Sequence, residues 1–246
     1  AKNLKIILTI FFIFFTLEAK SKNIYSKDFN SKELSNYFSG VISHNNQKNE
    51  QALKYFKSSK QLLNKHEEYF KKLIFSLVLN QNVDRAIQEI KFLKNKNQTE
   101  FFEAQLLLLI DSINKKNFSK TKLYLDSLAE YTEEGTFEKV IHETLRDYAF
   151  TFEEKKMSNF KSNFGNLIAI NNAFQSCYLN NPKTLEYFDR LQSSDAADYS
   201  RYLFFYVNYL VHEKRFNLLK DISLKIDELS SNLIILQTKS WIDKSE

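Results

Sequence analysis

Glycine, proline and cysteine are scarce in this chain: its 246 residues include 3 Gly, 1 Pro and 1 Cys. Because glycine and proline form most tight turns, and glycine lines phosphate-binding loops, this shortage argues against an all-β sandwich, a dinucleotide-binding sheet or a P-loop enzyme. A single cysteine cannot form an intramolecular disulfide, so the cysteine count does not decide the redox compartment. The composition favours helices joined by short polar turns.

Arginine is also scarce, and no long stretch carries charge of one sign. The 35 Lys and Arg residues are interleaved with 30 Asp and Glu residues, for a net charge of +5. A nucleic-acid surface needs clustered cations with few acids between them, because its affinity comes from phosphate neutralisation. The short lysine runs of this chain have Glu or Asn within a helical turn, which is typical of solvated helix faces. We therefore expect no nucleic-acid partner.

The clearest local signal is an apolar run near the start of the chain. Lysines precede the apolar residues 6–17, and a small residue and a polar stretch follow them. These are the parts of a secretory signal peptide. A helix needs about 20 apolar residues to span a bilayer, so a retained membrane anchor fits less well, and an apolar first helix packed on the domain is a third interpretation. We expect residues 1–19 to be a signal peptide or N-terminal anchor and residues 20–30 a polar linker.

After residue 30, apolar residues recur at helical spacing, and 23 Phe and 13 Tyr supply ample surface for a core. No linker divides residues 31–246. The pattern predicts short polar turns, which should pack consecutive helices antiparallel. The predicted helices cover residues 32–44, 49–63, 66–79, 83–94, 100–114, 118–130, 137–154, 166–179, 182–192, 196–213, 216–229 and 233–243.

Small and aromatic residues recur about 34 residues apart, the period of a helix-pair repeat. Gly40 is a small residue where two helices can cross closely, Ala52 is a second small residue opposite it, and Phe56 is an aromatic plug. The register is broken at residues 130–166, where we expect a long first helix and a short second helix around residues 157–164. The equivalent second-helix positions are Ala86 and Ile90, Thr121 and Leu125, Thr184 and Leu191, and Leu219 and Ile226.

These residues resemble the tetratricopeptide repeat (TPR) family, whose units are helix pairs of about 34 residues. The best match spans residues 34–60, with Gly40 in the first helix and Ala52 and Phe56 in the second. The usual Trp of the first helix is absent from every unit, and the usual Pro after the second helix is replaced by Asn64 and Gln98. The resemblance covers about residues 31–229 and implies an all-α, TPR-like helix-pair solenoid. An unrelated helical bundle is the alternative.

Catalytic motifs are absent. His66, His142 and His212 are each followed by Glu, but none has a second His one turn on, as a helical zinc site needs. Cys177 has no His nearby in sequence and is typical of a buried packing thiol. Adjacent acids point in different directions on a helix and form no acid/base pair. We expect no enzymatic activity, no metal and no cofactor.

The TPR resemblance implies a concave groove lined by the first helices, suited to a peptide or an amphipathic helix of a partner protein. Each candidate could instead pack in the core, because aromatic residues at helical spacing usually do. Some TPR domains bind an acidic C-terminus with a Lys and an Asn on adjacent first helices. Lys71 is at the position of the Lys, but Phe75 replaces the Asn, so we do not expect that ligand. The candidate partner-binding residues are Tyr37, Val41, His44, Glu68, Lys71, Phe75, Leu106, Ile110, Arg201, Phe204 and Asn208.

The sequence therefore predicts an exported protein-interaction scaffold, with the bacterial periplasm as the location that the resemblance implies. If the N-terminal segment is uncleaved, it would tether the scaffold to the membrane. The alternative function is the helical part of a larger envelope enzyme, such as a cell-wall hydrolase, whose catalytic module lies outside this chain. Trp241 is either part of a terminal cap or of a further helix pair in a longer protein.

Overall fold

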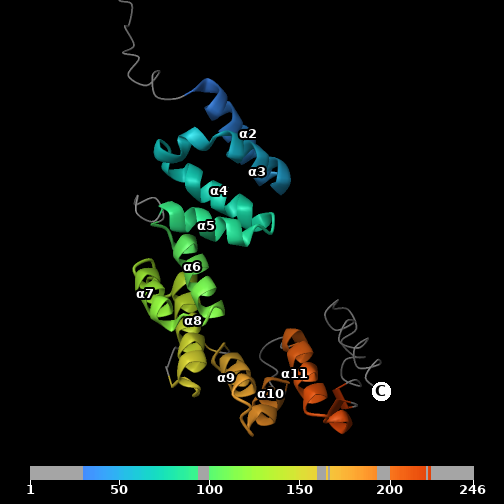
Figure 1. Cartoon of the computed structure of the whole chain (residues 1–246). Coiled ribbons are helices and arrows are strands. Elements are labelled where there is room, and N and C mark those ends of the chain that lie inside the picture. The colour runs from blue at the N-terminus through green and yellow to red at the C-terminus, as the bar shows by residue number, and fades with distance from the viewer. Residues whose placement is uncertain are drawn as a thin grey trace, which may run out of the picture. The chain divides into compact units, whose positions relative to one another are not determined.

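The computed structural model describes residues 30–93, 100–159, 165, 167–192, 200–219, 221 and 222. All regular secondary structure in these ranges is helical (Figure 1), so the described chain is all-α, as predicted. The predicted N-terminal segment, the linker up to residue 29, and the predicted helix at 233–243 lie outside the described residues. Contacts divide the chain into two compact units, Ala1–Thr99 and Glu100–Glu246.

The helix bounds follow the predicted pattern closely in both units. Helical residues at 216–219 and at 221 and 222 follow α11. In unit 1 the elements are α2 (Ser31–Asn45), α3 (Asn49–Ser58), the 3₁₀ helix η1 (Lys60–Asn64), α4 (Glu67–Leu79) and α5 (Val83–Leu93). In unit 2 they are α6 (Phe102–Asn114), α7 (Phe118–Ala129), α8 (Phe137–Glu154), α9 (Leu167–Tyr178), α10 (Thr184–Gln192) and α11 (Ser200–His212).

The same turn joins five pairs of consecutive helical segments. One residue adopts a left-handed conformation, at Gln47, Gln81, Lys116, Asn180 and Lys214. The N–H of the residue after it reaches the carbonyl five positions back, as in a Schellman helix end. The step is 34 residues from Gln47 to Gln81, 35 from Gln81 to Lys116 and 34 from Asn180 to Lys214, but 64 from Lys116 to Asn180. The period of about 34 residues expected for helix pairs therefore holds on either side of α8 and is broken across it. These bonds join Lys48 to Ser43, Asn82 to Leu77, Asn117 to Ser112, Asn181 to Ser176 and Arg215 to Leu210.

The core of unit 1 forms where α2 crosses α3. Gly40 is buried, and a Cβ atom on it would lie 2.8 Å from the ring of Phe56. Ala52 and Phe56 are fully buried, as are Ala86 and Ile90 at the equivalent positions of α5. The small residue at the crossing thus makes room for the aromatic plug that the sequence predicted.

In unit 2, hydroxyl groups meet where the paired helices cross. Ser112 and Thr121 join α6 to α7 by a buried contact of 3.0 Å between their hydroxyl oxygens, and Ser176 and Thr184 join α9 to α10 in the same way at 3.0 Å. Beside α10, the rings of Phe188 and Tyr206 stack with their centroids 5.1 Å apart. Polar pairs and aromatic stacking therefore join consecutive helices in unit 2.

Two predicted helices differ in the structure. The prediction of one helix over residues 49–63 is wrong, because α3 ends at Ser58 and η1 follows. The hydroxyls of Ser58 and Ser59 donate to the carbonyls of Lys54 and Tyr55, and such bonds compete with the helical pattern. The short helix expected around residues 157–164 is absent at 157–159, which have no regular structure, and residues 160–164 lie outside the described part.

Candidate functional site

An open groove of about 620 Å³ lies within unit 2, and we call it the α6–α9 groove. Its volume is within the range of about 300–1,000 Å³ that is usual for ligand sites. The lining comes from the end of α6, the turn into α7, and the ends of α8 and α9. Its residues are Ile110, Ile113, Asn114, Lys116, Phe118, Phe152, Glu153, Lys155 and Tyr178.

Aliphatic and aromatic side chains form most of this surface. Ile110 is 48% exposed, so its side chain offers apolar surface in the groove. The ring of Phe152 meets that of Tyr178 edge-on, with centroids 4.7 Å apart, and stacks on Tyr148 at 6.0 Å. Phe152 of α8 and Tyr178 of α9 therefore form the aromatic side of the groove and stabilise each other, while Ile110 and Ile113 of α6 form its aliphatic side.

Two lysines reach the groove from the ends of helices. Lys116 has a φ of 53° in the turn after α6, and Lys155, the C-cap residue of α8, has a φ of 55°. The N–H of Lys155 bonds to the carbonyl of Thr151, and its ammonium group donates to the hydroxyl of Tyr178. The same ammonium lies 4.7 Å from the centre of the Tyr178 ring. The left-handed conformation fixes where each lysine leaves its helix.

Among the described residues that line the groove, Glu153 is the only one with a carboxylate, and a lysine of α7 neutralises it. The ammonium of Lys122 lies 2.9 Å from a carboxylate oxygen of Glu153. Lys116 and Lys155 form no ion pair with any residue that the structure describes. The rim of the groove therefore carries net positive charge beside an apolar surface.

Of the predicted partner-binding residues, Ile110 lines this groove, and Leu106, one turn earlier on α6, is half-buried. On α11, Asn208 donates to the carbonyl of Phe204 at 2.9 Å, and both side chains are half-buried. The side chain of Arg201 lies outside the described residues. Neither Phe204 nor Asn208 is among the residues that line the groove.

The aromatic cluster of α11 differs in one respect from the predicted stripe of Tyr202, Phe205, Tyr206 and Tyr209. Phe205 is 47% exposed, although its ring meets Phe174 edge-on with centroids 4.9 Å apart. It precedes the buried Tyr206 and so lies about 100° around the helix from it, at the edge of the packed face. Phe205 is therefore more exposed than Phe204, the residue that the pattern assigned to the groove.

The predicted residues of α2 lie partly in the core. Tyr37 is 6% exposed, its ring centroid is 4.7 Å from that of His66, and it also contacts Phe56. It offers little surface to a partner. Val41 and His44, farther along the same helix, are half-buried.

The predicted residues of α4 do come together in part. The ammonium group of Lys71 lies 5.9 Å from the centre of the Phe75 ring, one turn along the helix, and both side chains are half-buried. Glu68 is exposed. This arrangement leaves a mixed polar and aromatic surface on unit 1, separate from the residues that line the α6–α9 groove.

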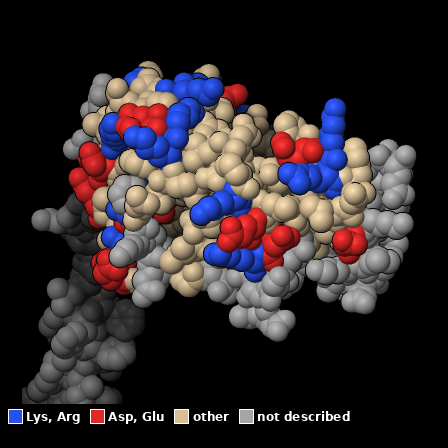
Figure 2. Space-filling view, turned by 90° about the horizontal axis from the view of Figure 1, so that it is seen from below, with Lys and Arg blue, Asp and Glu red and all other residues tan. Residues whose placement is uncertain are grey.

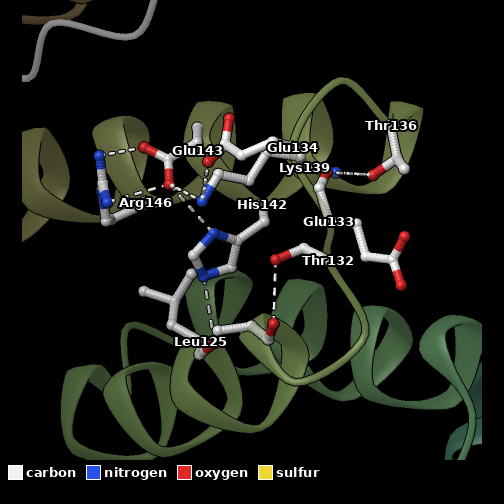
Figure 3. A network of polar contacts seen from close by, with 10 residues as sticks. Leu125, Thr132, Glu133, Glu134, Thr136, Lys139, His142, Glu143 and Arg146 are labelled. Carbon is white, nitrogen blue, oxygen red and sulfur yellow. Dashed lines mark hydrogen bonds and ion pairs between the residues drawn. The ribbon is translucent and has the colours of Figure 1, made fainter.

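A second cluster of functional groups lies on α8 and is polar (Figure 3). The buried carboxylate of Glu143 contacts the guanidinium of Arg146, and it also lies 3.5 Å from the ammonium of Lys139. The Nε2 atom of His142 is 3.2 Å from the carbonyl oxygen of Leu125, so Nε2 must be the donor. Its Nδ1 lies 3.4 Å from Glu143. The bond between His142 and Leu125 ties α8 to α7.

Asp147, one turn after Glu143, is 4% exposed, and burial raises the pKa of its carboxyl group to about 6 despite the nearby charge of Arg146. One of its oxygens has no hydrogen-bond partner among the described residues. Beyond it, the side chain of Gln175 accepts a hydrogen bond of 2.8 Å from the N–H of Ser158. This buried polar layer fixes the segment that leaves α8 against α9.

Nothing in the described ranges forms a group of three or more His, Cys, Asp or Glu residues that could hold a metal ion. The single thiol, Cys177, is half-buried, and burial raises its pKa, with Glu213 adding to the effect. A raised pKa lowers the thiolate fraction that a nucleophile requires. His66 and His212 therefore belong to no such group in these parts of the chain.

Charge of both signs is mixed on one face of the molecule. On the face drawn in Figure 2, basic and acidic side chains lie interspersed, with uncharged surface between them. Among the helices that the structure describes, none combines the length and the apolar character that crossing a bilayer requires.

Comparison with models of protein families, with curated proteins and with solved structures gives no match for this chain. The groove and its chemistry are therefore the basis for any functional conclusion.

Sequence reasoning missed Phe118, Phe152, Lys155 and Tyr178 as members of one groove. The available signal was the 18-residue length of α8, which has no second helix of ordinary length after it in the pattern. A long helix without its own partner leaves its last turn to pack against the next helix. That is where Phe152 meets Tyr178.

Proposed function

We propose that this protein is an interaction module that binds a segment of a partner protein in the α6–α9 groove. The observation that carries the proposal is the open apolar surface around Ile110 and Phe152, braced by aromatic contacts and edged by lysines. A peptide or an amphipathic helix could place one large apolar side chain there. No catalytic or metal-binding role is part of this proposal.

The recurring turns support a second part of the proposal, that the helix pairs form TPR-like repeats. Five turns share one geometry, and three of the four steps between them are 34 or 35 residues, which fits helix pairs of that kind. The groove draws largely on α6, α8 and α9, which are first helices in the predicted pairing. In TPR-like architecture, the first helices line the binding surface.

The sequence of residues 1–19 supports export, with the bacterial periplasm as the proposed location. If that segment stays attached, it would hold the same interaction module at a membrane. The binding proposal is independent of either outcome, because the groove lies entirely within unit 2.

Site-specific photocrosslinking tests the binding function. A photoreactive residue is placed at position 110 in the groove, and a control is placed at position 123, where Leu123 is 53% exposed on α7 but does not line the groove. We expect position 110, and not position 123, to crosslink to a defined partner segment in the cells that make the protein. That segment is then synthesised and its affinity measured.

The matched variants are Ile110→Asp and Leu123→Asp, which introduce the same charge at two exposed aliphatic positions. We expect Ile110→Asp to weaken binding of the purified segment at least tenfold, because an ionised carboxylate would face an apolar surface. Leu123→Asp should bind like the wild type. Equal binding by both variants, when both unfold at the wild-type temperature, would exclude the groove as the binding site.

A further inference from the structure

Positive charges outnumber negative charges around the α6–α9 groove. The apolar contact proposed above does not involve them. Glu153 is neutralised by Lys122 at 2.9 Å. Lys155 contacts Tyr178, whose hydroxyl is uncharged, and Lys116 has no ion pair with a described residue. Two full positive charges therefore remain at the edge of an apolar surface.

The backbone holds both charges in place. Lys116 and Lys155 are the left-handed residues that end α6 and α8, and these turns are closed by backbone hydrogen bonds. A cation at a helix end also lies beside the partial negative charge of the last carbonyls. At the turn position of Lys116, unit 1 has the neutral residues Gln47 and Gln81, and their φ values of 59° and 60° are close to the 55° of Lys155. A lysine is therefore not required by the conformation itself.

We infer that the α6–α9 groove selects partner segments that carry Asp or Glu next to the apolar side chain that enters the groove. The inference rests on the proposed function and specifies its ligand. Carboxylates beside the anchor would meet Lys116 and Lys155, whereas basic residues there would be repelled. A nucleic acid fits less well, because two lysines beside Ile110 and Ile113 do not supply the run of phosphate contacts that such binding needs.

Selection from a library of random peptides tests the inference. The library is displayed on phage and selected on the full-length protein, and clones that also bind the Ile110→Asp variant are removed. We expect the remaining clones to be enriched in Asp and Glu beside an aromatic or aliphatic residue, relative to the unselected library. Groove-dependent clones without this enrichment would overturn the inference and leave the proposed function standing. If no groove-dependent clone is recovered, both are overturned.

Charge variants then locate the effect. The double variant Lys116→Gln/Lys155→Gln keeps the backbone geometry, because Gln47 and Gln81 already adopt it. Its matched control is Lys120→Gln/Lys156→Gln, which removes the same charge from exposed residues that do not line the groove. We expect the first variant to bind an acidic clone about three- to tenfold more weakly, since exposed ion pairs contribute little each.

A neutral clone with the same apolar residue separates charge from shape. Its affinity should be the same for the wild type and for Lys116→Gln/Lys155→Gln, and the preference for the acidic clone should shrink as salt is added. An equal loss for both double variants would show that only the net charge of the protein matters, and it would overturn the assignment to Lys116 and Lys155.

Discussion

The hydroxyl of Tyr69 on α4 donates a hydrogen bond of 2.6 Å to the carbonyl oxygen of Phe56, near the end of α3. Tyr69 is fully buried, and burial raises its pKa well above the ordinary value. The bond thus anchors the last turn of one helix to the next helix pair.

Replacing Tyr69 by Phe should destabilise the protein by about 1–2 kcal/mol, because the carbonyl loses a buried donor while the packing of the ring is kept. Urea unfolding measures this difference. Tyr55→Phe is the control, since Tyr55 lies on α3 but is only half-buried. An equal effect of the two substitutions would contradict a special role for the Tyr69 hydroxyl.

Gly40→Ala should also destabilise, by about 1–3 kcal/mol. Helix propensity alone predicts the opposite, a gain of about 1 kcal/mol, but the new Cβ would lie 2.8 Å from the buried ring of Phe56. Thermal unfolding of Gly40→Ala, Phe56→Leu and the double variant decides between the two effects. The double variant should be more stable than the sum of the single changes predicts, because the smaller side chain removes the clash. A stabilised Gly40→Ala protein would refute this account of the crossing.

The buried pair of Ser112 and Thr121 predicts non-additive changes. Thr121→Val removes one hydroxyl and leaves that of Ser112 with fewer partners, so we expect a loss of about 1 kcal/mol. The double variant Ser112→Ala/Thr121→Val should lose little more, because both polar groups are then gone. At the equivalent positions in unit 1, Ser43 and Ala52 are both buried, so an apolar residue is compatible with the second-helix position. Strictly additive losses would argue against coupling between the two hydroxyls.

Asp147 predicts a defined dependence of stability on pH. Its pKa of about 6 in the folded protein is above the ordinary 3.8, so the folded state binds this proton more tightly than the unfolded state does. The cost of ionisation is absent well below pH 3.8, grows as the pH rises, and is complete above about pH 6. Asp147 therefore lowers stability at neutral pH.

Asp147→Asn should remove this dependence. The free energy of unfolding of the variant minus that of the wild type should be about 2 kcal/mol larger at about pH 7.5 than at about pH 4.5. Asp126→Asn is the control, because Asp126 is exposed on α7. If the difference between wild type and Asp147→Asn is the same at both pH values, the raised pKa is wrong.

The helices could be predicted from the sequence because each buries one face, and the apolar period shows that face directly. The break between α3 and η1 could not, because it depends on whether Ser58 and Ser59 bond to the preceding turn or to water. Of the residues that line the groove, only Ile110 was predicted, because its position on a first helix follows from the regular helix pattern. Phe152 and Tyr178 meet through the packing of α8 on α9, and no local pattern predicts the angle of that contact.

The recurring turns also bear on how the chain is made. Their hydrogen bonds join residues five positions apart. Most contacts between helices are also made by helices that follow one another in the chain. Such local contacts are associated with fast folding. A ribosome adds about 5–20 residues per second, so a pair of about 34 residues takes seconds to emerge, whereas helices form within about a microsecond. Each pair can therefore close during synthesis of the next, which shortens the time that large side chains such as Phe56 spend exposed to aggregation.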